Sequence, residues 1–268
     1  LKEILKIMRL NNINLIDTAK NYGNAEAIIG NNLLSQSYFD IVTKIDVKQF
    51  HNITAKSFSD FEYLIIDSLN KLKSKVIYGV LIHNPQILNI ESSKIIIDWL
   101  QDFKEKGIIK KIGISIYKKE DLEIFNLDKI DIVQLPLSIY DQTLIKNDTL
   151  EILIRNNIDI HVRSIFLQGL ILEESSKWPN FISDSLKNHH KNFSYFLSKN
   201  SISPIEATFL FLKSLNGIDS IIVGVSNKKE LQDICKSWNN ASKINFSDFN
   251  FKDWDLKGSK FLDPRNWP

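Results

Sequence analysis

The sequence has little cysteine, no large excess of charge of either sign, and no long hydrophobic run. Its single cysteine, Cys235, excludes an internal disulfide and is typical of a reducing cytosol, so we expect a cytoplasmic protein. The 34 basic and 32 acidic residues leave a net charge of +2, so no basic surface indicates a nucleic-acid partner. No apolar run approaches the roughly 20 residues of a transmembrane helix, so we expect no membrane partner.

Glycine-rich and linker segments are also missing. None of the apolar runs is followed by the pattern G-x-G-x-x-G, which argues against a doubly wound nucleotide-binding sheet. No Pro/Gly/Ser-rich stretch divides the chain, so we predict one domain over residues 1–268. The pair His189 and His190 lacks a partner at metal-ligand spacing, so we predict no metal site.

The sequence does contain enough apolar residues, 43%, for a sizeable core, and they fall into a regular pattern. Seven short runs rich in β-branched residues alternate with helical segments, and each is nearly continuous, as strands covered on both faces are. Parallel strands need crossover helices, so this alternation predicts a parallel sheet. The runs occupy residues 13–19, 40–45, 76–83, 110–117, 130–138, 158–166 and 218–226.

Helix signals lie between these runs. Residues 58–72 have one apolar face, and Ser57 is placed to cap that helix. Residues 93–107 form a second helical pattern that ends at Gly107, a residue type favoured just beyond a helix C-terminus. Two further helix starts are predicted by Ser203 with Pro204 and Glu206, and by Asn227 with Glu230.

Seven strand–helix units over 268 residues fit an α/β fold of the TIM (β/α)8 barrel type, one strand short of eight. An open doubly wound sheet usually has only five or six strands. Residues 1–12 have an amphipathic helical pattern and do not supply the eighth strand.

Polar residues end the first three runs: Asp17, Lys44 and His83. The carboxyl ends of barrel strands share one face, and neighbouring strands are about 4.8 Å apart, so these side chains should meet. Tyr22 lies in the loop after Asp17 and can fold back over them. A buried Lys44 needs Asp17 as its counter-ion. A nearby ammonium stabilises a phenolate, so we expect Tyr22 to exchange a proton near neutral pH.

Several motifs resemble the aldo-keto reductase family. The stretch NLIDTAKNYGNAEAIIG is followed by VTK, LIHNP, IGISIY and IVQLPLS in the family's order, and the resemblance covers nearly the whole chain. It implies a TIM barrel, a nicotinamide cofactor bound in extended form, and a small-molecule carbonyl substrate. By this resemblance Tyr22 donates a proton to the carbonyl, Lys44 paired with Asp17 tunes it, and His83 orients the substrate.

The same resemblance implies part of the nicotinamide site. Gln134 and Ser115 match residues that bind the nicotinamide amide, and Ser164 matches the serine after the family's seventh strand. Ile116 stands where the family often has asparagine, and Arg163 stands where many members have a stacking aromatic.

Phosphate-binding residues follow in the second half of the chain. Gly169 allows close backbone approach to the pyrophosphate. The backbone of Gly224, Ser226 and Asn227, at a helix N-terminus, suits a phosphate. The family's usual 2′-phosphate residues do not align, but Lys228 or Lys229 can replace them, so NADP(H) is favoured over NAD(H); solvated surface lysines are the alternative.

Two other classes of function stay open. A lysine at a strand end can attack a carbonyl, so a Schiff-base aldolase using Lys44 is one alternative. A cofactor-binding regulatory protein with weak or no turnover is the other, because binding and catalysis can separate on one scaffold. The sequence predicts neither the identity of the carbonyl substrate nor the oligomeric state.

In this family a first strand precedes the helix expected at residues 1–12. The resemblance therefore implies a barrel without its first strand, and we predict an N-terminal truncation of a longer protein by roughly 25–30 residues. A genuine seven-stranded variant, or a gap closed by the aromatic tail at residues 251–268, is the alternative. An open barrel has unpaired edges, so we expect poor stability and weak cofactor binding.

Overall fold

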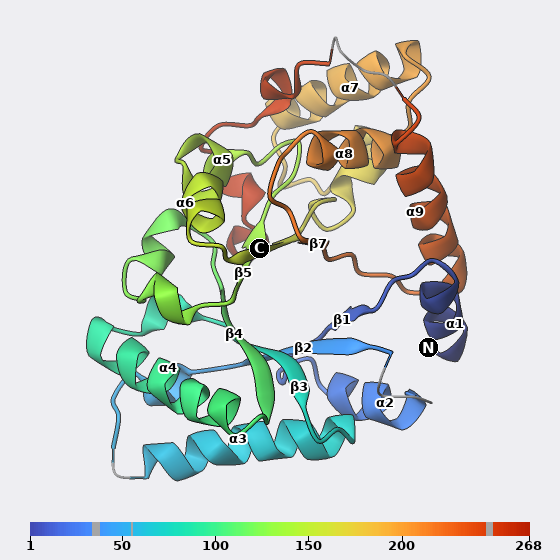
Figure 1. The fold of residues 1–268 in the computed structure, drawn as a ribbon. Coiled ribbons are helices and arrows are strands. Elements are labelled where there is room, and N and C mark those ends of the chain that lie inside the picture. Colours follow the sequence, from blue (N-terminus) through green and yellow to red (C-terminus); the bar gives the residue numbers. More distant parts are fainter. Residues whose placement is uncertain (34–37, 55, 245–248) are drawn as a thin grey trace. The chain divides into compact units, whose positions relative to one another are not determined.

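The computed structural model describes residues 1–33, 38–54, 56–244 and 249–268 (Figure 1). In this part of the chain one sheet contains seven strands in chain order, β1 to β7, and helices connect them. The pairs from β1 to β5 are parallel. The predicted α/β fold of the TIM (β/α)8 type is thereby confirmed.

Each predicted apolar run coincides with one strand, and only β4 begins outside its run, one residue earlier at Ile109. The second run has the predicted bounds, whereas the last strand has two residues, because the chain after Ile222 leaves the sheet. The strands are β1 (Leu15–Asp17), β2 (Asp40–Ile45), β3 (Ile77–Ile82), β4 (Ile109–Ser115), β5 (Ile132–Pro136), β6 (Asp159–Arg163) and β7 (Ser220–Ile221).

Most connections contain an α-helix. The β4–β5 connection instead has two short 3₁₀ turns, η3 (Lys119–Leu122) and η4 (Leu127–Lys129). The α-helices are α1 (Lys2–Leu10), α2 (Ala25–Asn32), α3 (Ser57–Leu72), α4 (Ile90–Glu105), α5 (Thr143–Lys146), α6 (Thr149–Arg155), α7 (Asp184–Lys199), α8 (Pro204–Lys213) and α9 (Lys228–Ala241). Among the described residues, no helix is both long and apolar enough to cross a bilayer.

The N-cap predicted at Ser57 is wrong. Ser57 is the first residue of α3 itself, and the N-cap position is Lys56, which makes no side-chain cap bond. The Ser57 hydroxyl instead accepts a hydrogen bond from the Thr54 N–H at 2.6 Å. This hydroxyl therefore stabilises the turn before the helix, a contact that spacing alone did not distinguish from a cap.

Other predicted helix ends are confirmed. Gly107 follows the C-cap of α4 with φ of +70°, a conformation that suits glycine. Ser203 and Glu206 form the predicted capping box at the start of α8. Helix α4 begins three residues before the expected position, because Asn89 caps it together with Ser92.

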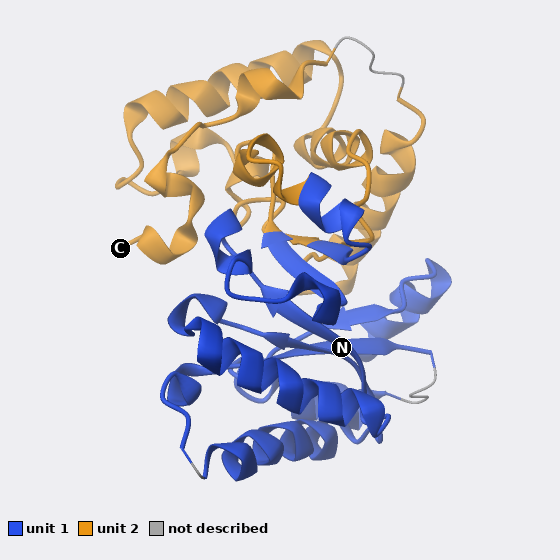
Figure 2. Cartoon of the chain, turned by 60° about the vertical axis from the view of Figure 1, so that its left-hand side comes forward, with its two compact units in different colours: residues 1–135, 151–161 blue, residues 136–150, 162–268 orange. Residues whose placement is uncertain are grey.

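The chain forms two compact units (Figure 2). Unit 1 consists of residues 1–135 and 151–161, and unit 2 of residues 136–150 and 162–268. The single domain over residues 1–268 remains a prediction.

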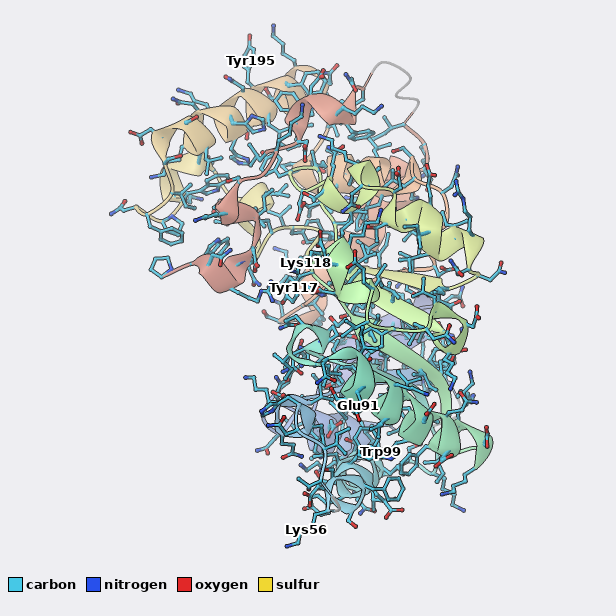
Figure 3. All side chains as sticks on the ribbon, turned by 90° about the vertical axis from the view of Figure 1, so that its left-hand side faces the viewer. Lys56, Glu91, Trp99, Tyr117, Lys118 and Tyr195 are labelled. Carbon is cyan, nitrogen blue, oxygen red and sulfur yellow. The ribbon has the colours of Figure 1, made fainter. Side chains whose placement is uncertain are left out.

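In unit 1, helices α2, α3 and α4 cover one face of strands β1 to β4 (Figure 1). Trp99 of α4, labelled in Figure 3, packs against Phe61 of α3 with ring centroids 5.2 Å apart. Helices α2 and α3 approach closely at Gly30, where an added Cβ would lie 2.2 Å from the carbonyl oxygen of Lys71. Only glycine allows this approach.

In unit 2, an aromatic and histidine cluster forms around the fully buried Tyr140. Its hydroxyl lies 2.6 Å from Nδ1 of His190, and Nε2 of His190 lies 2.8 Å from the carbonyl oxygen of Glu173. The tail joins this region, because the Leu256 N–H donates to the Tyr140 carbonyl at 2.9 Å. Asp255 likewise accepts the Gln142 N–H at 3.0 Å.

Candidate functional site

The pleat of the strands explains how unit 1 gathers polar side chains at one place. Strand residues two apart lie on the same face of a sheet. In each strand from β1 to β5, an apolar residue or glycine on one face is followed two positions later by a predicted site residue: Leu15 by Asp17, Val42 by Lys44, Leu81 by His83, Gly113 by Ser115, and Ile132 by Gln134. Three of these apolar side chains form a buried core cluster, and a fourth, Leu15, packs against it. The polar residues therefore lie directly above the apolar core of the sheet.

Lys44 and Asp17 form the buried ion pair at this site. Lys44 Nζ lies 2.6 Å from Asp17 Oδ2, and the side chains are 1% and 11% exposed, respectively. Lys44 also donates to the Thr18 carbonyl at 3.0 Å. The other oxygen, Asp17 Oδ1, accepts from Nε2 of Gln134 at 2.8 Å. The Asp17 carboxylate thus connects β1, β2 and β5, and the bond to Gln134 is a contact that the sequence did not indicate.

Tyr22 lies next to this pair in the turn after β1. Its N–H donates to the Ala19 carbonyl at 3.0 Å, which folds the turn back toward the strand end. Lys44 Nζ is 5.4 Å from the centroid of the Tyr22 ring. The ring of His83 meets the ring of Tyr22 edge to face, with centroids 5.9 Å apart. Because Tyr22 is 51% exposed above a buried ammonium, its phenol is accessible to a ligand.

Ser115 and Gln134 lie side by side, because they are register partners of β4 and β5. Both side chains are buried. The Gln134 side-chain oxygen, Oε1, has no hydrogen-bond partner in the described part of the chain. Ile116 is fully buried in the hydrophobic core, so it cannot supply the amide contact of the asparagine that it replaces.

Side chains also hold the loops that follow β2, β3 and β4. Asn84, immediately after His83, binds the Asp46 side chain and the Val47 backbone. This contact was missed at the sequence level, although LIHNP places an amide directly after the histidine. Beyond β4, Oδ2 of Asp121 accepts the N–H groups of Tyr117 and Lys118, labelled in Figure 3, at 2.8 and 3.1 Å.

The remaining predicted cofactor residues belong to unit 2. Ser164 follows β6 with φ of +61°, and Gly169 has φ of +88° before a 3₁₀ turn, Leu170–Leu172. Arg163 Nη1 lies 3.4 Å from the Ser164 hydroxyl. An added Cβ at Gly224 would meet no atom within 4 Å, so the backbone there is open to close approach.

The N-terminus of α9 is already hydrogen bonded by its own side chains. The Asn227 side-chain oxygen accepts the N–H groups of Lys229 and Glu230, as predicted for a cap. Glu230 accepts the Ser226 N–H at 2.7 Å and the Asn227 side-chain amide at 2.7 Å. A phosphate that binds the Ser226 N–H must therefore displace the Glu230 carboxylate.

Within the described ranges, no three His, Cys, Asp or Glu side chains lie close enough together to hold a metal ion. His189 and His190 instead bind backbone carbonyls of Trp254 and Glu173.

The family of the chain follows from comparison of its sequence with models of known protein families. The model of the aldo/keto reductase family matches residues 1–256. The chain belongs to the aldo/keto reductase family. Members of this family are oxidoreductases that generally use nicotinamide cofactors and act on small carbonyl substrates. A search of curated protein sequences found no match.

Solved aldo-keto reductases share the fold at low sequence identity. A thermostable aldo-keto reductase in complex with the inhibitor epalrestat has a TM-score of 0.70 and 19% identity, over 94% of this chain and 85% of that one. Aldo-keto reductase AKR11C1 from Bacillus halodurans has a TM-score of 0.68 and 19% identity, over 88% and 80%. The glycerol dehydrogenase AKR11B4 from Gluconobacter oxydans has a TM-score of 0.64 and 17% identity, over 93% and 88%.

The buried residues of unit 1 fit the nicotinamide group that this family uses. A buried amide oxygen without a partner costs free energy. Gln134 Oε1 is such an atom among the described residues, and its Nε2 is fixed by Asp17. This oxygen lacks a hydrogen-bond donor, and a carboxamide N–H is one group that can supply it; Ser115 is the register partner of Gln134 on the neighbouring strand.

Proposed function

We propose that this aldo-keto reductase uses NAD(P)H to reduce an aldehyde or ketone, with Tyr22 as the proton donor. The observation that carries the proposal is the half-exposed Tyr22 phenol, which lies beside the His83 ring and above the buried Lys44–Asp17 pair. The unpartnered oxygen of Gln134 supports a nicotinamide carboxamide beside them.

The proposed roles follow from charge and position. When bound, the nicotinamide cofactor supplies the hydride. Tyr22 gives its hydroxyl proton to the carbonyl oxygen, and the Lys44 ammonium stabilises the phenolate that remains. Asp17 balances the charge of Lys44, so that the buried ammonium persists through the reaction. His83 donates a hydrogen bond that holds the carbonyl oxygen beside Tyr22.

Two observations argue against a Schiff-base aldolase. Lys44 is 1% exposed, and its Nζ donates to the Asp17 carboxylate and to the Thr18 carbonyl. An amine that attacks a carbonyl must be uncharged and accessible. Lys44 Nζ is instead buried and donates to two oxygen acceptors, an arrangement that suits electrostatic stabilisation of Tyr22.

We also propose NADP(H) as the favoured cofactor and a cytoplasmic location. Lys228 and Lys229 begin α9, where a 2′-phosphate can gain from a nearby ammonium and from the helix N-terminus. Glu230 opposes this, since its carboxylate occupies the Ser226 N–H. The single cysteine, Cys235, supports a reducing compartment.

The test is oxidation of NADPH and of NADH, each followed by absorbance against a panel of aldehydes and ketones. The proposal expects reduction of at least one carbonyl class and its loss in Tyr22→Phe. Borohydride treatment in the presence of carbonyl should leave Lys44 unmodified, and a trapped adduct on Lys44 would support the aldolase. Cofactor binding without reduction of any carbonyl would support the regulatory alternative.

A further inference from the structure

The loops after β2 and β3 are joined by one asparagine side chain, Asn84. Its Nδ2 donates to Asp46 Oδ1 at 2.9 Å, and its Oδ1 accepts the Val47 N–H at 3.1 Å. Asp46 Oδ1 also accepts the Lys48 N–H at 2.9 Å. A single amide thus uses its donor and its acceptor to bind two consecutive residues of the neighbouring loop, and Asp46 in turn binds the third, Lys48.

This contact lies next to two of the proposed catalytic residues. Asn84 directly follows His83, and Asp46 is two residues beyond Lys44. The sheet ladder continues as far as His83, whose N–H donates to the Ile45 carbonyl at 2.9 Å. Beyond that bond, the hydrogen bonds of the Asn84 side chain connect the ends of β2 and β3.

The two hydrogen bonds require an amide at position 84, because one needs a donor and the other an acceptor. A carboxylate there would keep the bond from the Val47 N–H, but it would face the Asp46 carboxylate as a like charge. An alanine would lose both bonds and leave the Val47 N–H without its partner. Lys48 Nζ lies 3.9 Å from Asp46 Oδ2, whereas Asn84 binds the other oxygen, Oδ1.

We propose that Asn84 and Asp46 are a positioning pair that fixes the His83 ring against Tyr22 and Lys44. The proposal that this pair places the His83 ring concerns structure alone. The proposal that this placement supports catalysis rests on the proposed function. The pair holds the end of β3 against the end of β2, so the edge-to-face contact of the His83 and Tyr22 rings is maintained. Neither residue needs to touch the substrate for this role.

Three variants of the pair test the proposal. Asn84→Asp places two carboxylates face to face. Asp46→Asn keeps an oxygen that accepts from the Asn84 amide and from the Lys48 N–H. We therefore expect this variant to disturb the pair only slightly. The double variant Asp46→Asn/Asn84→Asp restores a donor–acceptor bond between the two side chains with the roles exchanged, although the Lys48 N–H must then turn to solvent. Asn126→Ala is the matched control, because Asn126 likewise accepts a backbone N–H, that of Asp128, at a 3₁₀ turn in the same unit.

The first measurement is the NMR signal of the His83 imidazole, assigned among the five histidines by His83→Gln. We expect one narrow His83 signal in the wild type, Asp46→Asn and Asn126→Ala. A shifted or broadened signal is expected in Asn84→Asp, with return toward the wild-type position in the double variant. An unchanged His83 signal in Asn84→Asp overturns the positioning role, whether or not the protein reduces carbonyls.

The second measurement separates kcat from cofactor affinity. A misplacement of about 1 Å can cost about 100-fold in rate, so kcat of Asn84→Asp should fall by about 10–100-fold while its Kd for NADPH stays within about twofold. The double variant should regain part of kcat. Equal losses in kcat and cofactor affinity, with no recovery in the double variant, would indicate general damage to the fold and contradict the proposal. If the wild type reduces no carbonyl, the proposed function fails, and the NMR result still decides the positioning role.

Discussion

Replacing Tyr22 with phenylalanine removes one oxygen atom and its proton while keeping the ring. The ring contact with His83 and the position above Lys44 should persist. General acid catalysis is worth about 10²–10⁴-fold, so we expect a loss of that size in kcat for carbonyl reduction. Cofactor binding, measured by fluorescence titration, should stay nearly unchanged. A variant that keeps full activity would show that the proton comes from elsewhere.

Lys44 and Asp17 should behave as one unit. Lys44→Met removes the ammonium beside the phenol, so activity should fall as far as in Tyr22→Phe. Asp17→Asn should reduce activity less, but it leaves a buried ammonium without its carboxylate, which costs about 3–5 kcal/mol of unfolding free energy. Denaturant unfolding and a double-mutant cycle on kcat check both effects. Additive, independent losses in the cycle would contradict the coupling.

At the scale of single residues, the sequence predicted which candidate side chains lie close together at the strand ends. Asp17, Lys44 and His83 were predictable because polar residues at the ends of apolar runs must share one rim of a parallel sheet. The bonds of Asn84 to Asp46 and of Gln134 to Asp17 were not, because they depend on side-chain directions across neighbouring or distant strands. Ser57 was misassigned because a hydroxyl beside a helix start can bind either the helix or the turn before it.

At the scale of elements, helix α9 carries the proposed choice of cofactor. A contact between a 2′-phosphate and Lys228 or Lys229 should contribute about 1.5–3 kcal/mol as a charge-assisted bond. The double variant Lys228→Ala/Lys229→Ala should therefore raise the Kd for NADPH by about 10-fold or more and leave that for NADH unchanged. Isothermal titration with both cofactors measures this. Equal effects on the Kd values of the two cofactors would show that neither lysine contacts the 2′-phosphate and that both are solvated surface residues.

A substitution of Glu230, in the same helix, should change NADPH affinity in the direction opposite to that of the lysine substitutions. Its carboxylate holds the Ser226 N–H that a phosphate would use. Glu230→Gln keeps an acceptor for that N–H and removes the negative charge, so NADPH should bind more tightly while NADH changes little. A stronger gain for NADH than for NADPH would contradict a phosphate at this end of α9.

Strand positions were predictable from the sequence to different extents along the chain. The run at residues 40–45 has a clear apolar pattern, and β2 has those bounds. The run at 218–226 is equally apolar, yet only Ser220–Ile221 form β7. Apolar composition indicates burial, but the extent of a strand also depends on a neighbour with free backbone groups, which the sequence does not show.

At the scale of the whole molecule, the buried pair Tyr140–His190 links stability to pH. Burial lowers the pKa of His190 below its ordinary value, although the Glu173 carbonyl opposes this, and burial raises the pKa of Tyr140 well above its own. In the unfolded chain His190 takes up a proton near pH 6.5, whereas the folded state resists it. The contribution of His190 to stability is therefore complete above about pH 6.5 and is lost as the pH falls below that value.

We expect the melting temperature to decrease between pH 7.5 and pH 5, and we expect His190→Gln to flatten that decrease. His51→Gln is the control, because His51 is exposed in unit 1. Circular dichroism melts at several pH values measure both. An identical pH slope in wild type and His190→Gln would show that another group is responsible.

The contact between α2 and α3 at Gly30 has a consequence for variation of the sequence. The missing side chain is the reason that the two helix backbones can touch. If position 30 were randomised and the library sorted for folded protein, glycine alone should be enriched, because alanine already collides with a backbone atom that cannot rotate away. Selection at Tyr22 would follow activity instead. Comparing enrichment at the two positions would therefore separate variants that fail to fold from variants that fold but cannot react.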